Sequence, residues 1–325
     1  MNVALAHDPA SPSTPQENLP EDHGAEYDDT RTIDALLDAI RSQGHRATDL
    51  LLNDDFQQQL RQAAPDMVFN IAEGRQGPGR ESVAPAWLEH VGIPYTGSDA
   101  LTMALTLDKH MSKALAQAHG IATAEWHLLE RKEQIDDVEL TGPMFVKPNA
   151  EGSSMGIRRS SVVRGRNELR ETAGWVIENY PQGCLVEEFL PGGEFCAGFL
   201  GNETPEELPI VEIRTEDGYY PYEDKSRHRK ELACPADIPS ELRDSILEMG
   251  RRAYRTFRCR DFGRVDIKLD EDGQPRFVEI NPLPGLSPDY SIFTHQARAA
   301  GLSFQETIGR IIDAARSRYD PGERK

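Results

Sequence analysis

Residues 263–282, GRVDIKLDEDGQPRFVEINP, contain side chains whose types and spacing could bind a metal ion. Arg264 and Asp266 lie two residues apart, and so do Glu279 and Asn281. Side chains two apart on a strand point to the same face of a sheet, so each pair shares a face if this segment is a hairpin. Mg²⁺ prefers hard oxygen ligands and is usually held by one or two carboxylates plus substrate phosphates. The spacing therefore predicts a magnesium site formed by Asp266, Glu279 and Asn281.

The dipeptide Asp272-Gly273 predicts the turn of this hairpin and thereby its register. If these two residues form the centre of the turn, Asp266 faces Glu279 and Arg264 faces Asn281. A solvated hairpin face with a cross-strand ion pair would show the same residues and would contribute little to stability. The apolar residues that alternate with the polar ones favour a strand packed within a larger sheet.

A loop rich in glycine and serine follows a predicted strand that ends at Lys147. Gly152 and Gly156 allow backbone N–H groups to approach an anion, and Ser153 and Ser154 can add hydroxyl donors. The lysine precedes the glycines, so the loop differs from the common GxxxxGK[ST] phosphate loop. An ordinary turn is the alternative interpretation.

Two further charged clusters are less specific. Lys109 and Lys113 share one helical face at a spacing of four, a pattern that usually marks a solvated surface. Glu187, Glu188 and Glu194 surround a Pro-Gly-Gly bend, which is most often an ordinary charged turn.

Alternating strands and helices must position these groups, and the predicted fold class is α/β. In the first hundred residues we expect strands at 1–8 and 67–74, a short strand and turn at 93–98, and helices at 32–45 and 82–92, which together form a small parallel α/β domain. Residues 9–29 are too rich in Pro, Ser and acidic residues to pack well, so a long loop is predicted. Ser98 is the predicted cap of a long helix over 100–120.

Strands dominate after residue 120, at 142–148, 184–189, 194–201 and 208–214, with helices at 240–259 and 307–319. The predicted domains are an N-terminal α/β substrate domain (1–98), a central lobe with the phosphate loop (99–186) and a C-terminal lobe with the metal site and an acceptor loop (187–325).

Composition excludes several classes of function. The chain has 36 Lys and Arg against 55 Asp and Glu, a net charge of −19, which argues against nucleic-acid binding. No stretch approaches the ~18 apolar residues of a membrane span, and the N-terminus does not resemble a signal peptide, so a cytoplasmic location is expected. The four cysteines show no CxxC spacing and are predicted to be reduced packing residues.

Eight motifs in order resemble the D-alanine–D-alanine ligase family of the ATP-grasp superfamily. They are IPYTGSD, LDKHMSK, VKPNAEGSSMG, VEEFLPGGEF, YEDK, CPAD, GRVD and EINPLPG. The resemblance covers nearly the whole chain, from VFNIAEG to the last helix. It implies an ATP-grasp fold and an ATP-dependent ligase that activates a carboxylate as an acyl phosphate, joins it to an amine and releases ADP. The implied cofactors are ATP and Mg²⁺, with two metal ions expected and Mn²⁺ as an alternative.

The resemblance also implies roles for individual residues. The residues matched to the ATP site are Lys109, Lys147, Glu151, Gly152, Ser153, Ser154, Gly156, Glu187, Glu188, Phe189, Leu190, Glu194 and Lys225. Within this set the two lysines Lys109 and Lys147 meet the phosphates, Glu187 contacts adenine and Glu194 contacts ribose. Lys225 lies on a mobile loop that closes over the phosphates.

The residues matched to catalytic roles are Arg264, Ser153 and Lys225, and Arg264 would meet the developing oxyanion. Gly285 lies in the loop that binds the acceptor. The serine of that loop falls near PDYS with an offset of one residue, so Tyr290 or Ser291 could fill its place. The partners expected are small-molecule carboxylates and amines, and a homodimer is one expectation because family members are commonly dimers.

The half of the site that holds the first amino acid departs from the family pattern. The GGxSxE loop after the first strand is replaced by the longer segment 7–29, and the tyrosine after the loop lysine is Ser226. The His-Gly of the family's LHGxxGEDG motif is Glu73-Gly74. Glu73, Arg80 and Glu81 are predicted to replace the missing groups, with surface charges as the alternative.

Four hypotheses about function follow. The first is a carboxylate–amine ligase that acts on amino acids or similar small molecules, and the second is a D-alanine–D-alanine ligase of cell-wall precursor synthesis. A non-catalytic ATP-binding protein should have lost a metal ligand or a phosphate lysine, and all are present. A kinase-like phosphoryl transferase would have no use for Arg264 or for a closed acyl-phosphate pocket.

Overall fold

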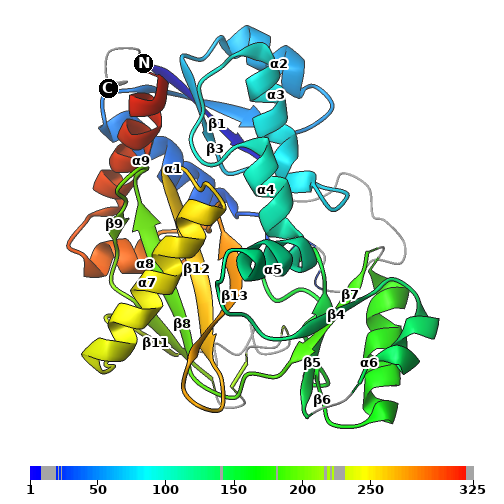
Figure 1. Ribbon diagram of the computed structural model, residues 1–325. Coiled ribbons are helices and arrows are strands. Elements are labelled where there is room, and N and C mark those ends of the chain that lie inside the picture. Colours follow the sequence, from blue (N-terminus) through cyan, green and yellow to red (C-terminus); the bar gives the residue numbers. More distant parts are fainter. Residues whose placement is uncertain are drawn as a thin grey trace.

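The computed structural model describes residues 1–8, 20, 22, 24–139, 142–180, 182–215, 218–219, 222 and 231–319. Lys225 and Ser226 lie outside these residues. The described chain forms three sheets, and helices cover their faces (Figure 1).

The first sheet is parallel, as the alternating pattern predicts. Its central strand β1 (Asn2–His7) lies between β2 (Arg46–Leu51) and β3 (Met67–Asn70). The helices are α1 (Thr30–Ser42), α2 (Phe56–Ala63) and α3 (Val83–Val91), with the short 3-10 helix η1 (Arg80–Ser82) before α3. The sequence pattern did not indicate β2 or α2, because their polar residues interrupt the periodicity. The segment 93–98, expected to be a short strand and turn, forms one parallel bridge, between Val68 and Tyr95, and then bends.

The predicted helix over 100–120 is two helices, α4 (Ala100–Leu107) and α5 (Lys109–Ala118). Asp108 separates them in an extended conformation, with ψ at 102°, and its carboxylate accepts the N–H of Met111 at 2.9 Å. Asp108 is therefore the N-cap of α5, so Lys109 begins that helix. The expected cap Ser98 is also wrong, because Asp99 caps α4 while the Ser98 hydroxyl accepts the N–H of Arg260.

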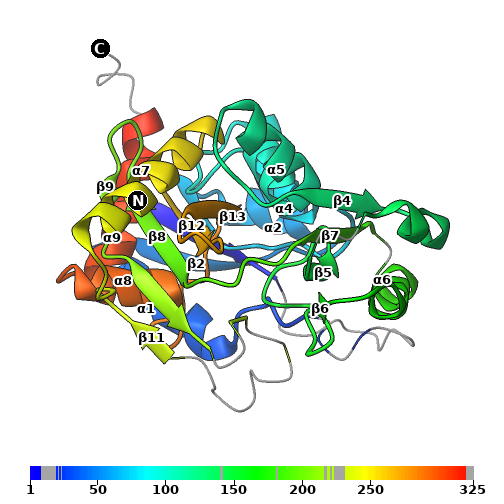
Figure 2. The same ribbon diagram turned by 60° about the horizontal axis from the view of Figure 1, so that its bottom comes forward.

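The second sheet is antiparallel, in the order β4 (Trp126–Leu129), β7 (Cys184–Glu188), β5 (Met144–Pro148) and β6 (Val162–Val163). The helix α6 (Arg166–Asn179) packs on it and forms a core with Val146 and Val186, while the 3-10 helix η2 (Lys132–Asp137) follows β4 (Figures 1 and 2). The strand β5 carries Lys147 and delivers the chain into the glycine- and serine-rich loop.

The third sheet runs in the order β11 (Glu231–Ala233), β10 (Val211–Arg214), β8 (Glu194–Leu200), β12 (Phe262–Leu269) and β13 (Pro275–Asn281), with β9 (Glu206–Glu207) paired to β8. Helix α7 (Ser240–Thr256) covers one face, and α8 (Ile292–Ala299) and α9 (Phe304–Tyr319) cover the other (Figure 2). The core around α9 includes residues of α1 and β1, so the first and third sheets share buried contacts.

Among the described helices, none has both the length and the apolar character that crossing a membrane would require. The four cysteines are free, and Cys184, Cys196 and Cys259 are buried, as expected for packing residues.

Candidate active site

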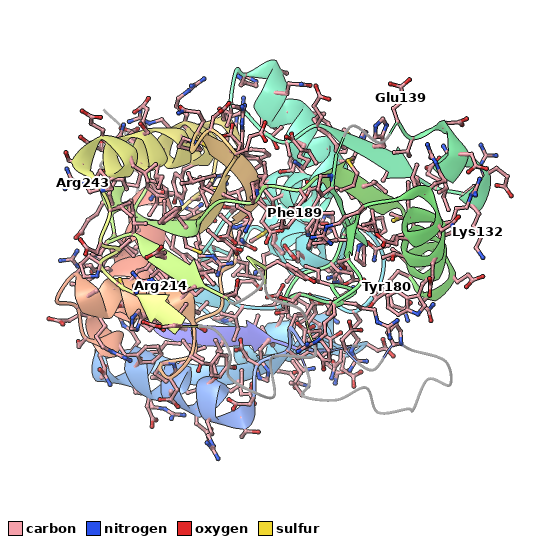
Figure 3. The ribbon with its side chains drawn as sticks, turned by 90° about the horizontal axis from the view of Figure 1, so that it is seen from below. Lys132, Glu139, Tyr180, Phe189, Arg214 and Arg243 are labelled. Carbon is pink, nitrogen blue, oxygen red and sulfur yellow. The ribbon has the colours of Figure 1, made fainter. Side chains whose placement is uncertain are left out.

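A cavity of about 670 Å³ is lined by residues of the second and third sheets and by segments next to the first sheet. Figure 3 shows Phe189, one of the lining residues, near the middle of the view, between the lobe of α7 and the lobe of α6. All the sequence-predicted site residues in the described part of the chain line this cavity, apart from Gly156 and Arg80. The structure thus brings together groups that are up to about two hundred residues apart in the chain.

The hairpin of β12 and β13 has the predicted register at the site. Asp266 faces Glu279, and Arg264 faces Asn281. The turn itself differs from the expectation, because Asp270 donates its N–H to the carbonyl of Gln274 at 3.0 Å and so leaves three residues, 271–273, in the turn.

A β-bulge restores the register that the longer turn would have shifted. Ile267 pairs with Phe277, whereas Asp266 pairs with Glu279, so Val278 is the extra residue on β13. Because a shift of one residue turns every side chain to the other face, this bulge decides that Glu279 faces the cavity.

The predicted metal ligands form a hydrogen-bonded group with two cations. Arg264 binds Asp266 through both carboxylate oxygens, at 2.7 and 2.8 Å, and Asn281 donates to Asp266 at 3.0 Å. The Lys109 ammonium lies 3.2 Å from Glu279. Burial raises the pKa of Glu279, but Lys109 and Lys147 outweigh burial and hold that pKa below its usual range. Both proposed carboxylate ligands are thus matched by a positive charge.

The chemistry of this donor set suits Mg²⁺ rather than zinc. Within the described residues no group of three or more His, Cys, Asp or Glu side chains could enclose a metal. Two carboxylates and one amide leave most positions of an octahedral ion to water and to the oxygens of a ligand.

Lys109 and Lys113 do not lie on a solvated face, and that interpretation is wrong. Their exposed fractions are 7% and 1%. Lys113 lies 2.9 Å from Glu187, and Lys147 lies 2.5 Å from the other oxygen of the same carboxylate. Burial alone would raise the pKa of Glu187, yet Lys113 and Lys147 lower it to about 2. Sequence analysis missed Lys113 as a site residue, although its spacing from Lys109 was visible.

The loop after β5 has the conformation that its glycines and serines allow. Ser153 and Ser154 have positive φ values of 50° and 60°, and Gly156 has φ at 73°. A Cβ on Gly156 would lie 2.3 Å from the Pro148 ring, so glycine is required by packing, although Gly156 does not line the cavity. The Lys109 ammonium donates to the carbonyl of Glu151 at 2.5 Å, which joins the start of α5 to the loop.

An aromatic wall stands beside the charged groups. Phe145 and Phe189 are stacked with ring centroids 6.4 Å apart, and Tyr219 meets Phe145 edge-on at 5.5 Å. Leu190 and Ile157 also line this part of the cavity. Such a wall can accept a planar ring.

Glu194 and Lys268 form a further charged pair in the cavity, 3.7 Å apart. Burial raises the pKa of Glu194, and Lys268 opposes that shift. Lys268, which is 8% exposed, was not predicted, because only the carboxylates of its strand match the metal-ligand pattern.

The acceptor loop distinguishes between the two predicted candidates. The Ser291 hydroxyl accepts the N–H of Ser287 at 2.9 Å and lies close to Gly285, where a Cβ would be 3.0 Å from it. Tyr290 is 58% exposed. Both line the cavity, and Ser291 is the more firmly held of the two.

The far end of the cavity, next to the first sheet, is rich in carboxylates. Glu73 and Glu81 line it, as predicted, and so do Glu26 and Asp28 from the segment that was expected to be an unpacked loop. The described residues of this segment form no helix or strand, as expected of a loop, but the expected lack of packing is wrong, because Asp22 is 6% exposed and accepts the N–H of Gly156 at 2.7 Å. No local pattern could have shown that this segment meets the phosphate loop.

Arg80 is buried behind the cavity wall and connects three segments. Its guanidinium binds both oxygens of Glu26 at 3.0 and 2.9 Å, the carboxylate of Glu151 at 3.1 Å and the carbonyl of Ala150 at 2.7 Å. The alternative that Arg80 is a surface charge is therefore wrong, since only 5% of it is exposed.

Comparison with known proteins identifies the family. A family model described as D-ala D-ala ligase C-terminus matches residues 115–313. The D-alanine–D-alanine ligase of Actinobacillus succinogenes is 32% identical over 286 residues, which cover 86% of this chain and 90% of that protein. The chain belongs to the D-alanine–D-alanine ligase family. This membership confirms the resemblance seen in the motifs, the ATP-grasp fold and the predicted enzyme class, an ATP-dependent, ADP-forming C–N ligase.

Two further similarities extend the family assignment. A Sinorhizobium fredii protein named y4sG, whose function is uncharacterized, is 38% identical over 258 residues, covering 78% of this chain and 75% of that protein. The crystal structure of the D-alanine–D-alanine ligase from Bacillus anthracis, complexed with ATP, superposes with a TM-score of 0.78 over 99% of this chain and 100% of that one. At 22% identity, this second likeness is evidence for the fold of this family member.

Proposed function

We propose that this member of the D-alanine–D-alanine ligase family joins a small-molecule carboxylate to an amine through an acyl phosphate. The observation that carries the proposal is the pairing of Asp266 with Glu279 across the hairpin, beside Lys109 and Arg264. This arrangement combines oxygen ligands for a metal with cations for a phosphoryl group in one cavity, which phosphoryl transfer to a carboxylate requires.

The charged groups at the hairpin suit a ligand that brings both signs of charge. Asp266, Glu279 and Asn281 would hold Mg²⁺, and Lys109 and Lys147 would turn from their carboxylates to the phosphates of ATP. Bound there, Mg²⁺ neutralises the charge of the transferred phosphoryl group. A second metal ion, and Mn²⁺ in place of Mg²⁺, belong to the proposal as well.

The aromatic wall supports a place for the nucleoside. Phe145, Phe189 and Leu190 offer an apolar surface to adenine, with the backbone and carboxylates of Glu187 and Glu188 at its edge. Glu194 would meet the ribose, and Lys268 beside it would hold that carboxylate in place.

The reaction would proceed in two steps. The donor carboxylate attacks the γ-phosphate of ATP, which gives an acyl phosphate and ADP, and the amine then displaces phosphate from the carbonyl. Arg264, fixed by its two bonds to Asp266, would stabilise the oxyanion of the second step, a contribution of roughly 3–4 kcal/mol. Ser153 and Lys225 would close over the phosphates and exclude water from the acyl phosphate.

The remaining assignments complete the proposal. Gly285, Ser291 and Tyr290 would contact the amine acceptor, while Glu73 would contact the donor and Arg80 would hold the loops around it. The division into domains 1–98, 99–186 and 187–325 stays a prediction, and so does a homodimer.

Trapping the acyl phosphate tests this function. The protein with Mg·ATP, a panel of D- and L-amino acids and hydroxylamine should release ADP and form hydroxamates, identified by mass, and replacing hydroxylamine with a second amino acid should give a dipeptide. ADP release without any hydroxamate or amide would contradict acyl transfer. ATP binding without turnover of any pair would instead support a non-catalytic ATP-binding protein.

A further inference from the structure

Lys113 is a buried cation behind the wall of the cavity. Its ammonium donates to the hydroxyl of Thr123 at 2.7 Å, lies 2.9 Å from the Glu187 carboxylate and donates to the carbonyl of Ala124 at 3.4 Å. An ammonium has three donors, and Lys113 is thus surrounded by three acceptors. Lys113 is 1% exposed and is not among the described residues that line the cavity. It therefore cannot turn towards a ligand without leaving these acceptors.

Glu187 has a lysine at each of its carboxylate oxygens. Lys147 lies 2.5 Å from Oε1, and Lys113 lies 2.9 Å from Oε2. Lys147 lines the cavity, and its turn towards the phosphates of ATP is part of the proposed function. When Lys147 turns away, Lys113 is the cation that stays beside Glu187. Without it, the buried carboxylate would take up a proton near neutral pH, because burial disfavours the charged form.

The Glu187 carboxylate lies on the same face of the second sheet as the aromatic wall. Glu187 on β7 pairs with Phe145 on β5, and residues directly opposite each other point to the same face. Phe145 and Phe189 are stacked, and all three residues line the cavity. A purine ring placed against this wall would therefore present its edge to Glu187.

The protonation state of Glu187 decides which edge of a purine it can bind. An ionised carboxylate only accepts hydrogen bonds, whereas a protonated one can also donate. Adenine has an amino group at carbon 6, which donates to the ionised form. A base with a carbonyl at that carbon, such as hypoxanthine, would place one acceptor against another. Glu187 must therefore stay ionised while ATP is bound in order to distinguish the two bases.

We propose that Lys113 is a positioning residue that selects the nucleobase. By holding the Glu187 carboxylate charged and fixed after Lys147 has turned to the phosphates, it restricts the site to a purine that donates an amino hydrogen. This proposal rests on the proposed function, which places ATP in the cavity. It gives a role to a lysine that is buried behind the cavity wall rather than beside the ligand.

ATP and inosine triphosphate (ITP) test the proposal, because ITP has a carbonyl in place of the 6-amino group. The two nucleotides also differ at ring nitrogen 1, so the quantity compared between variants is the ratio of their dissociation constants, measured by calorimetry with Mg²⁺. The native protein should prefer ATP by about tenfold or more, the size of one hydrogen bond to a charged group. Lys113→Met removes the cation and should lose most of that preference.

A dependence on pH separates this role from a merely structural one. In Lys113→Met, a rise from pH 6 to pH 8 should ionise more of Glu187 and restore part of the preference for ATP. Glu187→Gln has no charge to restore, so its low preference should stay constant, and adding Lys113→Met to it should change the ratio no further. Lys132→Met, which removes an exposed lysine of the same lobe, is the control and should match the native protein.

A native preference in Lys113→Met, or a lost preference that does not return with pH, would overturn the role of Lys113. If Lys113→Met fails to fold, the native protein decides. Its ratio should be constant between pH 6 and pH 8 and should exceed that of Glu187→Gln, and a ratio that rises with pH or equals that of Glu187→Gln would end the proposal.

The outcomes also separate this proposal from the proposed function. The measurements need binding alone, so ATP binding without any hydroxamate would end the ligase function and leave the role of Lys113 to be decided by the ratios. Hydroxamate formation together with a native ratio in Lys113→Met would end only the role of Lys113. Failure to bind either nucleotide would end both proposals.

Discussion

The two ends of the cavity handle charge in opposite ways. At the hairpin end each carboxylate faces a cation, as in the pairs Lys109–Glu279 and Arg264–Asp266. At the acidic end, where Asp28, Glu73 and Glu81 line the cavity, Glu73 and Glu81 lie next to each other. Arg80 beside them is already bonded to Glu26 and Glu151.

This difference indicates what each end receives. A balanced set of charges can exchange partners with a ligand that is itself a pair of opposite charges, such as a metal with phosphates. An unbalanced set gains most from a ligand of the opposite sign. The hairpin end is therefore suited to chemistry shared by the whole family, whereas the acidic end is suited to the selection of one substrate.

Removing a carboxylate from the hairpin end should have the largest effect, and that effect should be on turnover. Glu279→Ala deletes a proposed metal ligand and leaves Lys109 without its partner. We expect turnover to fall by about 100- to 1000-fold, the range seen when one group that stabilises the transferred charge is lost. Steady-state ADP release across a Mg²⁺ titration measures this, and circular dichroism should show an intact fold. Near-normal turnover would mean that the hairpin does not hold the metal.

Replacing Arg80, the cation beside the acidic end, should lower the free energy of unfolding more than it lowers turnover. Arg80→Met leaves Glu26 and Glu151 buried without their cation, and breaking a buried pair in this way costs about 3–5 kcal/mol. Urea unfolding measures the loss. The double variant Arg80→Met with Glu26→Gln is the matched control and should recover part of it. An unchanged unfolding free energy would show that solvent reaches Glu26 and Glu151 freely.

The two ends also differed in how far the sequence predicted them. The turn signal Asp272-Gly273 predicted the pairing of Asp266 with Glu279, and the alternation of polar residues in 263–282 predicted which side chains share a face, because both signals are local. The turn was predicted with the wrong length, and the register survived because the bulge at Val278 compensates. Such a bulge depends on packing against β8, which no pattern within the hairpin records.

The acidic end was only partly predicted, and for a physical reason. Glu73 and Glu81 stood out because they occupy positions where the family pattern has other residues. Asp8 and Asp28 did not, since their place depends on the segment before α1 folding back against η1, a contact between residues far apart in the chain. Low hydropathy indicated an unpacked loop there, but buried ion pairs such as Glu26–Arg80 stabilise its described part.

The unfolding free energy should depend on pH in opposite directions for the carboxylates of the acidic end and for Glu187, which is paired with lysines. The pKa of Glu81 is raised from 4.5 to about 7, and those of Asp8 and Asp28 from 3.8 to about 6. The folded state then binds more protons than the unfolded state, so stability is present below pH 4 and is lost as pH rises towards 7. The loss is about 1.4 kcal/mol for each pH unit that separates the folded and unfolded pKa values of a group. Glu187, whose pKa is lowered to about 2, gives stability that is lost as pH falls below 4.5.

Unfolding free energies measured between pH 3 and pH 8 check both expected losses, the one as pH rises towards 7 and the one as pH falls below 4.5. Glu81→Gln should flatten the fall in unfolding free energy between pH 4.5 and pH 7 and leave the loss below pH 4.5 unchanged. If the native protein becomes more stable from pH 5 to pH 8, the carboxylates of the acidic end are not crowded as described.

The smallest effect is expected from replacing Asp108, the N-cap of α5, the helix that positions Lys109 at the hairpin end. Asp108→Ala removes the acceptor for the Met111 N–H and should cost about 1 kcal/mol. The loss of this cap should also loosen the first turn of α5, where Lys109 meets both Glu279 and the carbonyl of Glu151, so KM for ATP should rise more than KM for the donor. Asp108→Asn keeps a capping oxygen without the charge and should behave as the native protein does. A larger change in KM for the donor than for ATP would place Lys109 at the acidic end of the cavity instead. The contrast between the two ends would then fail at a residue that acts electrostatically on carboxylates of both ends, Glu81 and Glu279.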